Sequence, residues 1–345
     1  MDRDALLAGL AERRPAALAR AISVVENGRP GFEGLLSALH PSLGRAHRIG
    51  ITGPPGAGKS TLTERLAAAY RAAGHTVGIV AVDPTSPFSG GALLGDRIRM
   101  EGIALDPGVF IRSMATRGSL GGLATSTREV CDVLDAAGFD RILVETVGVG
   151  QSELAVSRMA DTSLLVLVPE SGDGIQTLKS GIMEVADLFV VNKADRPGAD
   201  KLRSEIEITL GIRRGNAFRH VPAHHGFRAR AEAQAKAADA DDGGWKHPVL
   251  AAVAAKGEGV EAVISALEAH RHWLAASGTL RERRRRRLEE RTREVVDRAL
   301  VRWVWEGSGA EEAIRDRLED LEEGRTSPYE LAASILDALK QGARP

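Results

Sequence analysis

Residues 53–60, Gly-Pro-Pro-Gly-Ala-Gly-Lys-Ser, have the composition and spacing of a loop that binds nucleotide phosphates. They match the pattern G-x-x-x-x-G-K-S/T, with a predicted strand before them at 49–52 and a helical pattern after them. The glycines let backbone N–H groups converge on phosphate oxygens at a helix start, where the helix dipole favours anions. In such a loop Lys59 supplies a charge to the β- and γ-phosphates, and Ser60 offers its hydroxyl to Mg²⁺. We call residues 53–60 the phosphate loop.

Residues 192–195, Asn-Lys-Ala-Asp, follow another predicted strand and have the residue types that select guanine. The Asp195 carboxylate can accept hydrogen bonds from the ring N–H and the exocyclic amine, whereas adenine would leave it unpaired. Asn192 can reach the other edge of the base, and the stem of Lys193 can cover the ring face. Four such residues could also cap a turn, but their position downstream of a phosphate loop favours a guanine site.

Glu145 ends the predicted strand 141–145, and Gly148 follows three residues later. Many nucleoside triphosphatases place D-x-x-G at such a position, where the acid holds Mg²⁺ through water and the glycine amide contacts the γ-phosphate. The longer glutamate could reach metal-bound water or help to position the attacking water. A role limited to capping the strand end stays open for Glu145.

Other segments have a local structural interpretation beside a functional one. Asp83 and Asp96 have the sequence context of turn or helix N-caps, and Asp173 to Lys179 has that of an ordinary helix start. Ala254–Lys256 resembles the remaining base-contacting loop of a guanine site, although it also fits a plain strand end.

The elements that would position these residues alternate along the chain. Between about residues 47 and 257, short apolar runs alternate with helical stretches, which indicates α/β architecture with a mostly parallel sheet and helices on both faces. We predict a helical N-terminal segment over 1–45, a nucleotide-binding domain over 46–276 and a helical C-terminal arm over 277–345. The predicted strands are 49–52, 77–82, 109–112, 141–145, 164–168, 188–191 and 249–253, and the predicted C-terminal helices are 258–273, 280–305 and 310–339.

Composition narrows the class of protein. The 345 residues include 46 basic and 47 acidic side chains, a net charge of −1 that argues against a nucleic-acid coat or a strongly basic membrane binder. The one cysteine, Cys131, excludes an internal disulfide and a multi-cysteine metal site within one chain. The N-terminus lacks a secretory signal pattern, and the longest apolar run, 164–168, is far shorter than the ~20 residues of a membrane span. We therefore expect a cytoplasmic protein.

Five sequence segments together resemble the MeaB/ArgK/MMAA-type G proteins. The segments are GPPGAGKST, VAVDPTSPFSGGALLGDRIRM, VETVGVGQSE, GDGIQTLKSGI and NKAD, and the match covers roughly residues 45–275. Proteins of this family are GTPase chaperones of adenosylcobalamin-dependent acyl-CoA mutases, such as methylmalonyl-CoA mutase. The resemblance implies a P-loop NTPase fold of the SIMIBI class, with helical N- and C-terminal extensions, and a homodimer formed through the C-terminal arm.

The resemblance also implies roles for individual residues. Asp83, Asp96 and Glu145 would surround Mg²⁺ and move between nucleotide states, and the segment from Asp173 to Lys179 would be a third switch that senses the mutase. The candidate catalytic residues are Lys59, Glu145 and Asp96, and the candidate metal ligands are Ser60, Asp83, Asp96 and Glu145. The candidate nucleotide-binding residues are Gly53, Gly56, Ala57, Gly58, Lys59, Ser60, Thr61, Asn192, Lys193, Asp195, Ala255 and Lys256. The candidate switch and partner-sensing residues are Arg99, Gly148, Gln151, Asp173, Gln176 and Lys179.

These observations predict a Mg²⁺-dependent GTPase with slow intrinsic turnover. Val149 follows Gly148, where a water-positioning glutamine would be expected, so a partner would complete catalysis. The partner would be an adenosylcobalamin-dependent acyl-CoA mutase, with no nucleic acid and no membrane involved. None of the nine histidines lies in Asp-x-His-x-x-Gly, so we expect the mutase, and not this chain, to bind cobalamin.

Two other classes of function stay open at this point. A nickel-insertion GTPase of the hydrogenase or urease type would share the α/β core, but it would need a Cys/His cluster that the lone Cys131 does not offer. A small-molecule kinase would give a phosphorylated product instead of free phosphate. The basic, histidine-containing insert 213–247 leaves the acyl-CoA mutase unspecified among those acting on methylmalonyl-, ethylmalonyl-, isobutyryl- and 2-hydroxyisobutyryl-CoA.

Overall fold

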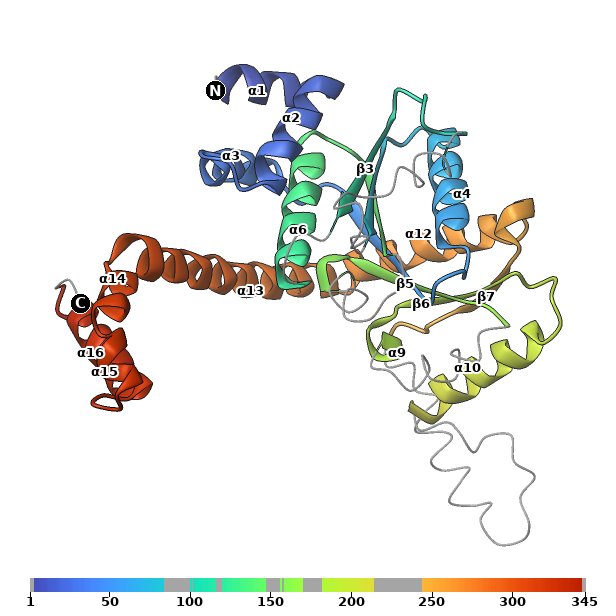
Figure 1. The fold of residues 1–345 in the computed structure, drawn as a ribbon. Helices are drawn as coiled ribbons and strands as arrows, with labels where there is room; N and C mark the ends of the chain where they lie inside the picture. The colour runs from blue at the N-terminus through green and yellow to red at the C-terminus, as the bar shows by residue number, and fades with distance from the viewer. Residues whose placement is uncertain are drawn as a thin grey trace, which may run out of the picture. The chain divides into compact units, whose positions relative to one another are not determined.

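The chain forms two compact units, Met1–Leu280 and Arg281–Pro345 (Figure 1). The boundary between the units lies in helix α13 (Thr279–Arg302). Among the described helices, none is long and apolar enough to cross a membrane. The computed structural model describes residues 3–83, 100, 102–115, 120–146, 156, 158–169, 182–213 and 244–342.

A parallel sheet forms the centre of the first unit. Over the described residues it has seven strands in the order β3-β2-β4-β1-β5-β6-β7. Each strand overlaps one of the predicted apolar runs, so the predicted α/β fold class is confirmed. Both faces of a parallel sheet are covered by crossover helices, which is why these strands are apolar runs and not alternating patterns. The strands are β1 (His47–Thr52), β2 (Val77–Asp83), β3 (Val109–Ala115), β4 (Arg141–Thr146), β5 (Thr162–Leu167), β6 (Leu188–Asn192) and β7 (Val249–Ala252).

One face of the sheet is covered by helices α4 (Lys59–Ala72) and α12 (Val260–Ala276) (Figure 1). Leu62 and Leu66 of α4 and Leu267 of α12 are fully buried against strand residues of this face. Because α4 continues directly from the phosphate loop, the packing of its apolar side chains fixes the position of the loop relative to the strands.

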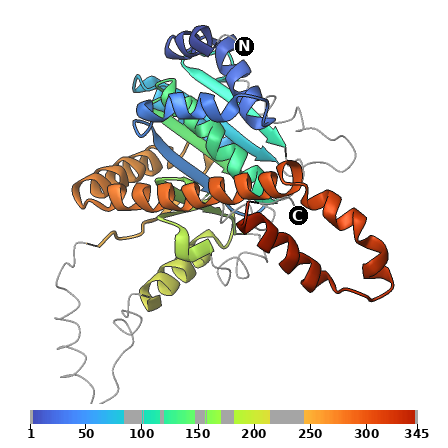
Figure 2. The same ribbon diagram turned by 90° about the vertical axis from the view of Figure 1, so that its left-hand side faces the viewer.

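The opposite face is covered by α6 (Leu120–Ala136) and, beyond it, by the N-terminal helices (Figure 2). Leu18, Ile22 and Leu35 are buried in the same hydrophobic core as Val130 and Leu134 of α6. The N-terminal helices therefore share a core with the sheet. The remaining helices of this unit are α1 (Arg3–Ala11), α2 (Pro15–Glu26), α3 (Phe32–Leu39), η1 (His40–Ser42), α9 (Ile182–Val185), α10 (Ala199–Arg213) and the turn η2 (Ala254–Lys256).

Helix α6 also fixes the chain where β1 begins. The buried Asp135 carboxylate accepts hydrogen bonds from the N–H groups of Gly44, Arg45 and Ala46 at 2.9, 3.1 and 2.9 Å. The same carboxylate lies 3.0 Å from the guanidinium of Arg48. A buried carboxylate without partners would be costly, so these contacts hold β1 in place at the end opposite to the phosphate loop.

The second unit differs from the sequence-based prediction in one helix. A single helix over 310–339 was expected, but the structure has α14 (Ala310–Asp316), α15 (Leu318–Glu322) and α16 (Pro328–Lys340), after the π-helical turn η3 (Trp303–Gly307). The chain turns at Gly324, which has a φ of +71°, and Ser327 and Glu330 form a capping box that starts α16. These local signals outweigh the helical periodicity.

A buried histidine lies at the start of β1. His47 Nε2 is 2.8 Å from Thr162 Oγ1, which in turn is 2.8 Å from His270 Nδ1. Burial is the main cause that lowers the pKa of His47 from 6.5 to about 4; the charge of Asp161 opposes this shift and that of Arg141 adds to it. His47 is therefore neutral in the folded protein at neutral pH.

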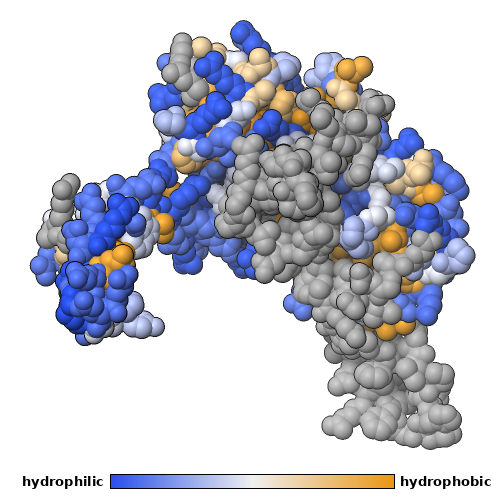
Figure 3. All heavy atoms as spheres, viewed as in Figure 1, coloured by the Kyte–Doolittle hydropathy of each residue, from blue (hydrophilic) through white to orange (hydrophobic). Residues whose placement is uncertain are grey.

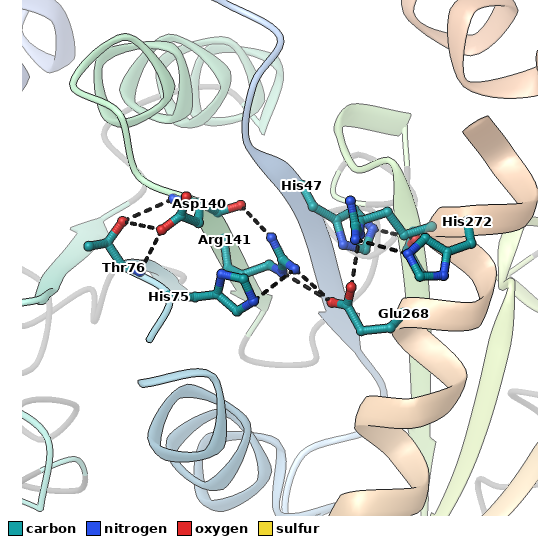
Figure 4. A network of polar contacts seen from close by, with 9 residues as sticks. His47, His75, Thr76, Asp140, Arg141, Glu268 and His272 are labelled. Atoms are coloured by element: carbon teal, nitrogen blue, oxygen red, sulfur yellow. Dashed lines mark hydrogen bonds and ion pairs between the residues drawn. The ribbon is translucent and has the colours of Figure 1, made fainter. Parts of the chain in front are cut away.

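Arg141 joins three elements beside His47 (Figure 4). Its guanidinium lies 3.0 Å from Glu268 of α12 and 5.1 Å from the centre of the Tyr70 ring of α4. It also lies 3.4 Å from the Nε2 atom of His75. These contacts connect β4, α4 and α12 at the amino end of the sheet.

We expect the free energy of unfolding to decrease as the pH falls from about 6.5 towards 4. The unfolded chain takes up a proton at His47 in this range and the folded chain does not. The stabilising contribution of neutral His47 is therefore fully present above pH 6.5 and is lost as the pH falls towards 4. A pKa difference of 6.5 − 4 corresponds to about 3 kcal/mol. Urea unfolding of His47→Gln, which cannot be protonated there, should show a weaker pH dependence by about this amount. His272→Gln on α12, which replaces an exposed histidine, is the control; an unchanged slope in His47→Gln would contradict the assignment.

Candidate functional site

The phosphate loop connects β1 to α4, as the sequence predicts. Gly53, Gly56 and Gly58 have φ values of +140°, +73° and +83°, which other residues rarely adopt. A Cβ at Gly53 would lie only 2.0 Å from the carbonyl oxygen of Val166, so β5 also requires glycine there. The loop is thus held in a curved conformation by its glycines and by the neighbouring strand.

Lys59 begins α4 and is buried beneath the loop. Its Nζ donates hydrogen bonds to the carbonyl oxygens of Gly53 and Pro54 at 2.8 and 2.9 Å. Thr61 lies half-buried in the same first turn. The first turn of a helix has N–H groups without intrahelical partners, so the ammonium group and these N–H groups together suit an anion.

Two oxygen-bearing side chains meet beside the phosphate loop. Ser60 Oγ donates a hydrogen bond of 2.5 Å to Oε1 of Glu145, which is buried near the end of β4. In the sheet, Glu145 lies beside Ile51 of β1. Asp83 ends β2, the strand on the other side of β4. Hydroxyl and carboxylate oxygens are ligands that Mg²⁺ prefers, so this pair fits such an ion.

Asn192 connects the phosphate loop to the turn η2. Its Nδ2 donates to the carbonyl oxygen of Ala57 at 2.8 Å, and its Oδ1 accepts from the N–H of Ala254 at 3.0 Å. The side chain is buried, and a Cβ at Gly58 would lie 2.4 Å from its Nδ2. Glycine at position 58 is therefore required both for the backbone conformation and for the approach of Asn192.

Asp195 and Lys256 form an exposed ion pair at the same edge of the sheet. The distance from Lys256 Nζ to Asp195 Oδ2 is 3.0 Å, and both side chains are about half exposed. The hydrogen bond and charge of Lys256 hold the pKa of Asp195 below its usual value, and Asp195 raises the pKa of Lys256. Lys193 has a left-handed φ of +56°, unusual for a residue other than glycine.

The structure brings together the predicted sites that lie in described residues. All of them lie at the carboxyl edge of the parallel sheet, where α/β proteins bind ligands. Glu145 and Asn192 lie in the last residues of β4 and β6, and the phosphate loop, Asp195 and η2 follow their strands. For Asp83 the position in β2 is described, but its side chain is not. Seven predicted residues lie outside the described residues: Asp96, Arg99, Gly148, Gln151, Asp173, Gln176 and Lys179.

One polar residue at this edge was missed by the sequence analysis. Arg65 of α4 donates to the carbonyl oxygens of Ala254 and Ala255, at 3.3 Å from Nε and 3.0 Å from Nη2. No local motif marks Arg65, because its partners lie about 190 positions further along the chain. Only the packing of α4 beside η2 reveals the contact.

A nickel-insertion GTPase would need a cluster of metal-binding side chains. Over the described part of the chain, no group of three or more His, Cys, Asp or Glu residues is placed to hold a metal ion. Cys131 is a buried free cysteine, and burial raises the pKa of its thiol to about 12. A thiol with so high a pKa is a poor metal ligand because the thiolate is the binding form.

Sequence comparison matches residues 18–309 to the family described as methylmalonyl-CoA mutase-associated GTPase MeaB. The chain belongs to this family. It is therefore a nucleotide-binding P-loop GTPase, an enzyme that hydrolyses GTP to GDP and phosphate. The resemblance predicted from the phosphate loop, the NKAD segment and the intervening segments is confirmed.

Individual relatives are similar to this MeaB-family protein along almost its whole length. A protein of Pyrococcus horikoshii named as a GTPase is 43% identical over 336 residues, covering 97% of this chain and 98% of the relative. GTPase ArgK of Escherichia coli is 33% identical over 317 residues, covering 91% of this chain and 89% of the relative. A crystal structure described as a LAO/AO transport system kinase superposes with a TM-score of 0.62 at 25% identity, covering 98% of this chain and 97% of that one.

We expect Asn192→Ala to lower the free energy of unfolding by about 2–4 kcal/mol in the absence of nucleotide. The substitution removes two hydrogen bonds and leaves the Ala57 carbonyl and the Ala254 amide of this buried contact without the partner they have now. Urea unfolding measures the change. Asn27→Ala, which removes an exposed side-chain bond to the Ser23 carbonyl, is a matched control and should change stability by less than about 1 kcal/mol. An equal effect of both substitutions would contradict a bridging role for Asn192.

Proposed function

We propose that this MeaB-family GTPase depends on Mg²⁺ and acts as a chaperone for an adenosylcobalamin-dependent acyl-CoA mutase. GTP binding and hydrolysis would gate the loading of the cobalamin cofactor and protect or reactivate the mutase. The observation that carries the nucleotide part is the joining of the phosphate loop and the base-selecting residues through the buried Asn192. The family description supports the mutase part.

Lys59 is proposed to hold the β- and γ-phosphates. Its ammonium group already lies under the loop, bonded to two loop carbonyls, so nucleotide binding would exchange these bonds for bonds to phosphate oxygens. The remaining contacts would come from backbone N–H groups of the loop and the start of α4 other than Pro54 and Pro55, including Gly56, Ala57, Gly58 and Thr61. Such a preformed site needs little reorganisation, which favours both binding and stabilisation of charge in the transition state.

Ser60, Asp83, Asp96 and Glu145 are proposed to hold Mg²⁺, although Asp96 lies outside the described residues. When bound, the ion would neutralise charge on the β- and γ-phosphates. The support is the 2.5 Å contact between Ser60 Oγ and Glu145 Oε1 at the start of α4, where two oxygen ligands converge. Glu145 is also proposed to orient the water that attacks the γ-phosphate. The proposed catalytic residues are Lys59, Glu145 and Asp96.

Asp195 is proposed to read the two guanine donors, the ring N–H and the exocyclic amine. The neighbouring Lys256 favours the ionised form of Asp195, and a carboxylate has enough acceptor sites for the base and the lysine at once. The left-handed backbone at Lys193 would direct its stem along the face of the base, and Ala255 would contact the base edge. Adenine would offer no donor pair to Asp195.

A second copy of this chain is proposed to cover helix α13. This helix, described over its whole length, buries none of its residues. Apolar residues about half exposed recur on it at helical spacing. They are Leu288, Val295, Val296, Leu300 and Val301. Where Figure 3 shows this helix, the surface is otherwise mostly hydrophilic. Apolar residues at such spacing are typical of helix–helix interfaces, which supports the proposed homodimer through residues 277–345.

The partner is tested by GTP hydrolysis with and without an adenosylcobalamin-dependent acyl-CoA mutase from the same source. We expect a low rate for the protein alone and a higher rate with the mutase, because Val149 stands where a water-positioning glutamine would be expected and a partner would complete catalysis. ATP is the control nucleotide, and Lys59→Ala, which removes the phosphate-binding charge, is the control protein without activity. A rate that the mutase leaves unchanged would reject the partner, and a preference for ATP would reject the guanine site.

The base assignment is tested by Asp195→Asn. Xanthine has an oxygen where guanine has the exocyclic amine, so an asparagine amide can donate to xanthine but opposes guanine. We expect the kcat/KM for GTP to fall by about 100-fold, because the asparagine amide places a donor against a donor of guanine and sites built on such hydrogen bonds reject mismatched bases strongly, and that for XTP to rise. Arg196→Ala, a change at the adjacent exposed residue, should leave both values near those of the wild type. GTP selectivity retained in Asp195→Asn would refute the role.

A further inference from the structure

Arg65 connects the helix of the phosphate loop to the base-recognition turn. It lies on α4, less than two turns after Lys59. Its guanidinium donates to the carbonyl oxygens of Ala254 and Ala255, which belong to η2. These contacts form a second connection between the two halves of the site, separate from the buried Asn192.

The turn η2 is too short to hold its own conformation. It has three residues, and its internal hydrogen bonds are Lys256 N–H to Val253 O at 2.9 Å and Gly257 N–H to Ala254 O at 3.1 Å. The Ala254 carbonyl accepts the second of these bonds, whereas the Ala255 carbonyl accepts neither, and a cation at the carboxyl end of a helical turn is favourable. The Arg65 fork supplies such a cation and bonds two consecutive carbonyls, so it fixes the orientation of the peptide planes in the turn.

The orientation of these peptides determines which N–H group is available to a ligand. The Ala254 N–H bonds Asn192, and the Lys256 N–H bonds Val253. The third N–H group of the turn, that of Ala255, takes part in neither of these two bonds. Asp195 offers only acceptors when ionised, so it can read the two donors of guanine but not the carbonyl oxygen O6. O6 requires an N–H donor of the kind that Ala255 carries.

We propose that Arg65 is a positioning residue for guanine recognition: by holding the Ala254 and Ala255 carbonyls, it aims the Ala255 N–H at O6 of the base. The proposal rests on the proposed function, because it assumes that the base lies between Asp195 and η2. Arg65 itself touches no nucleotide atom in this arrangement. Its effect should therefore be specific to O6 and absent from the recognition of the exocyclic amine.

Two GTP analogues separate these effects. In 6-thio-GTP sulfur replaces O6 and accepts hydrogen bonds weakly, while both donors for Asp195 remain. In ITP the exocyclic amine is missing, while O6 remains. The dissociation constants of GTP, 6-thio-GTP and ITP are measured for the full-length wild type, Arg65→Ala and Arg65→Lys by fluorescence competition. Arg71→Ala is the matched control, because Arg71 lies at the other end of α4 and bonds the His75 carbonyl and Asp106.

We expect Arg65→Ala to bind GTP several-fold more weakly, up to about tenfold, because the bond that it weakens is the neutral hydrogen bond from the Ala255 N–H to O6. The preference for GTP over 6-thio-GTP should shrink by a similar factor, and the preference for GTP over ITP should stay. Arg65→Lys, which can reach one carbonyl, should be intermediate. The KM for hydrolysis should rise while kcat at saturating GTP stays unchanged, because positioning of the base acts on binding.

Three outcomes would overturn the role of Arg65 alone, and a fourth would overturn the guanine site as well. Preferences among the three nucleotides equal to those of the wild type would show that Arg65 does not position the O6 donor. Equal changes in Arg65→Ala and Arg71→Ala would show only a general effect on α4. If Arg65→Ala does not fold, a wild-type 6-thio-GTP ratio in Arg65→Lys would reject the fork geometry. A wild type without preference for GTP over ATP would instead reject the guanine site, and the role of Arg65 with it.

Discussion

The buried amide of Asn192 is the contact on which the rest of the site depends. It donates to the phosphate loop and accepts from the turn η2, so each of its two polar atoms is satisfied by a different part of the site. A buried amide that loses either partner is costly. The loop and the turn therefore cannot move independently without breaking a buried hydrogen bond. The glycine at position 58 is part of the same constraint, because any side chain there would displace Asn192.

The parallel sheet explains why the carboxyl and amino ends of its strands carry different kinds of residues. At the carboxyl edge, glycines and polar side chains lie at or after the ends of β1, β6 and β7, and Glu145 lies near the end of β4. At the amino edge, Arg141, His47 and Asp135 are engaged with helices and with the chain that leads into β1. These amino-edge contacts are largely buried and join several elements, so they help to hold the strands in register. Their rigidity is what allows the opposite edge to present its groups at fixed distances.

The second unit shows where sequence patterns were insufficient. Apolar spacing over 310–339 is compatible with one helix, yet the helix is interrupted at Arg317 and then again by a left-handed glycine and a capping box, which gives three helices. The three short helices can fold back and bury a small core of Ala310, Leu331 and Ile335. A continuous helix would leave the same side chains in water. Tertiary burial thus agrees with the local stop signals against the periodicity.

The sequence by itself determined those parts of the site whose residues are close together along the chain. The glycines, Lys59 and Ser60 lie within one loop, and Asn192 and Asp195 lie within four residues, so covalent geometry already restricts their arrangement. Only the tertiary structure decided which distant groups meet them. Arg65 and Ala255 are about 190 positions apart, and the contact exists because α4 packs beside η2. Strand order and helix packing arise from burial of the whole core, which no local spacing encodes.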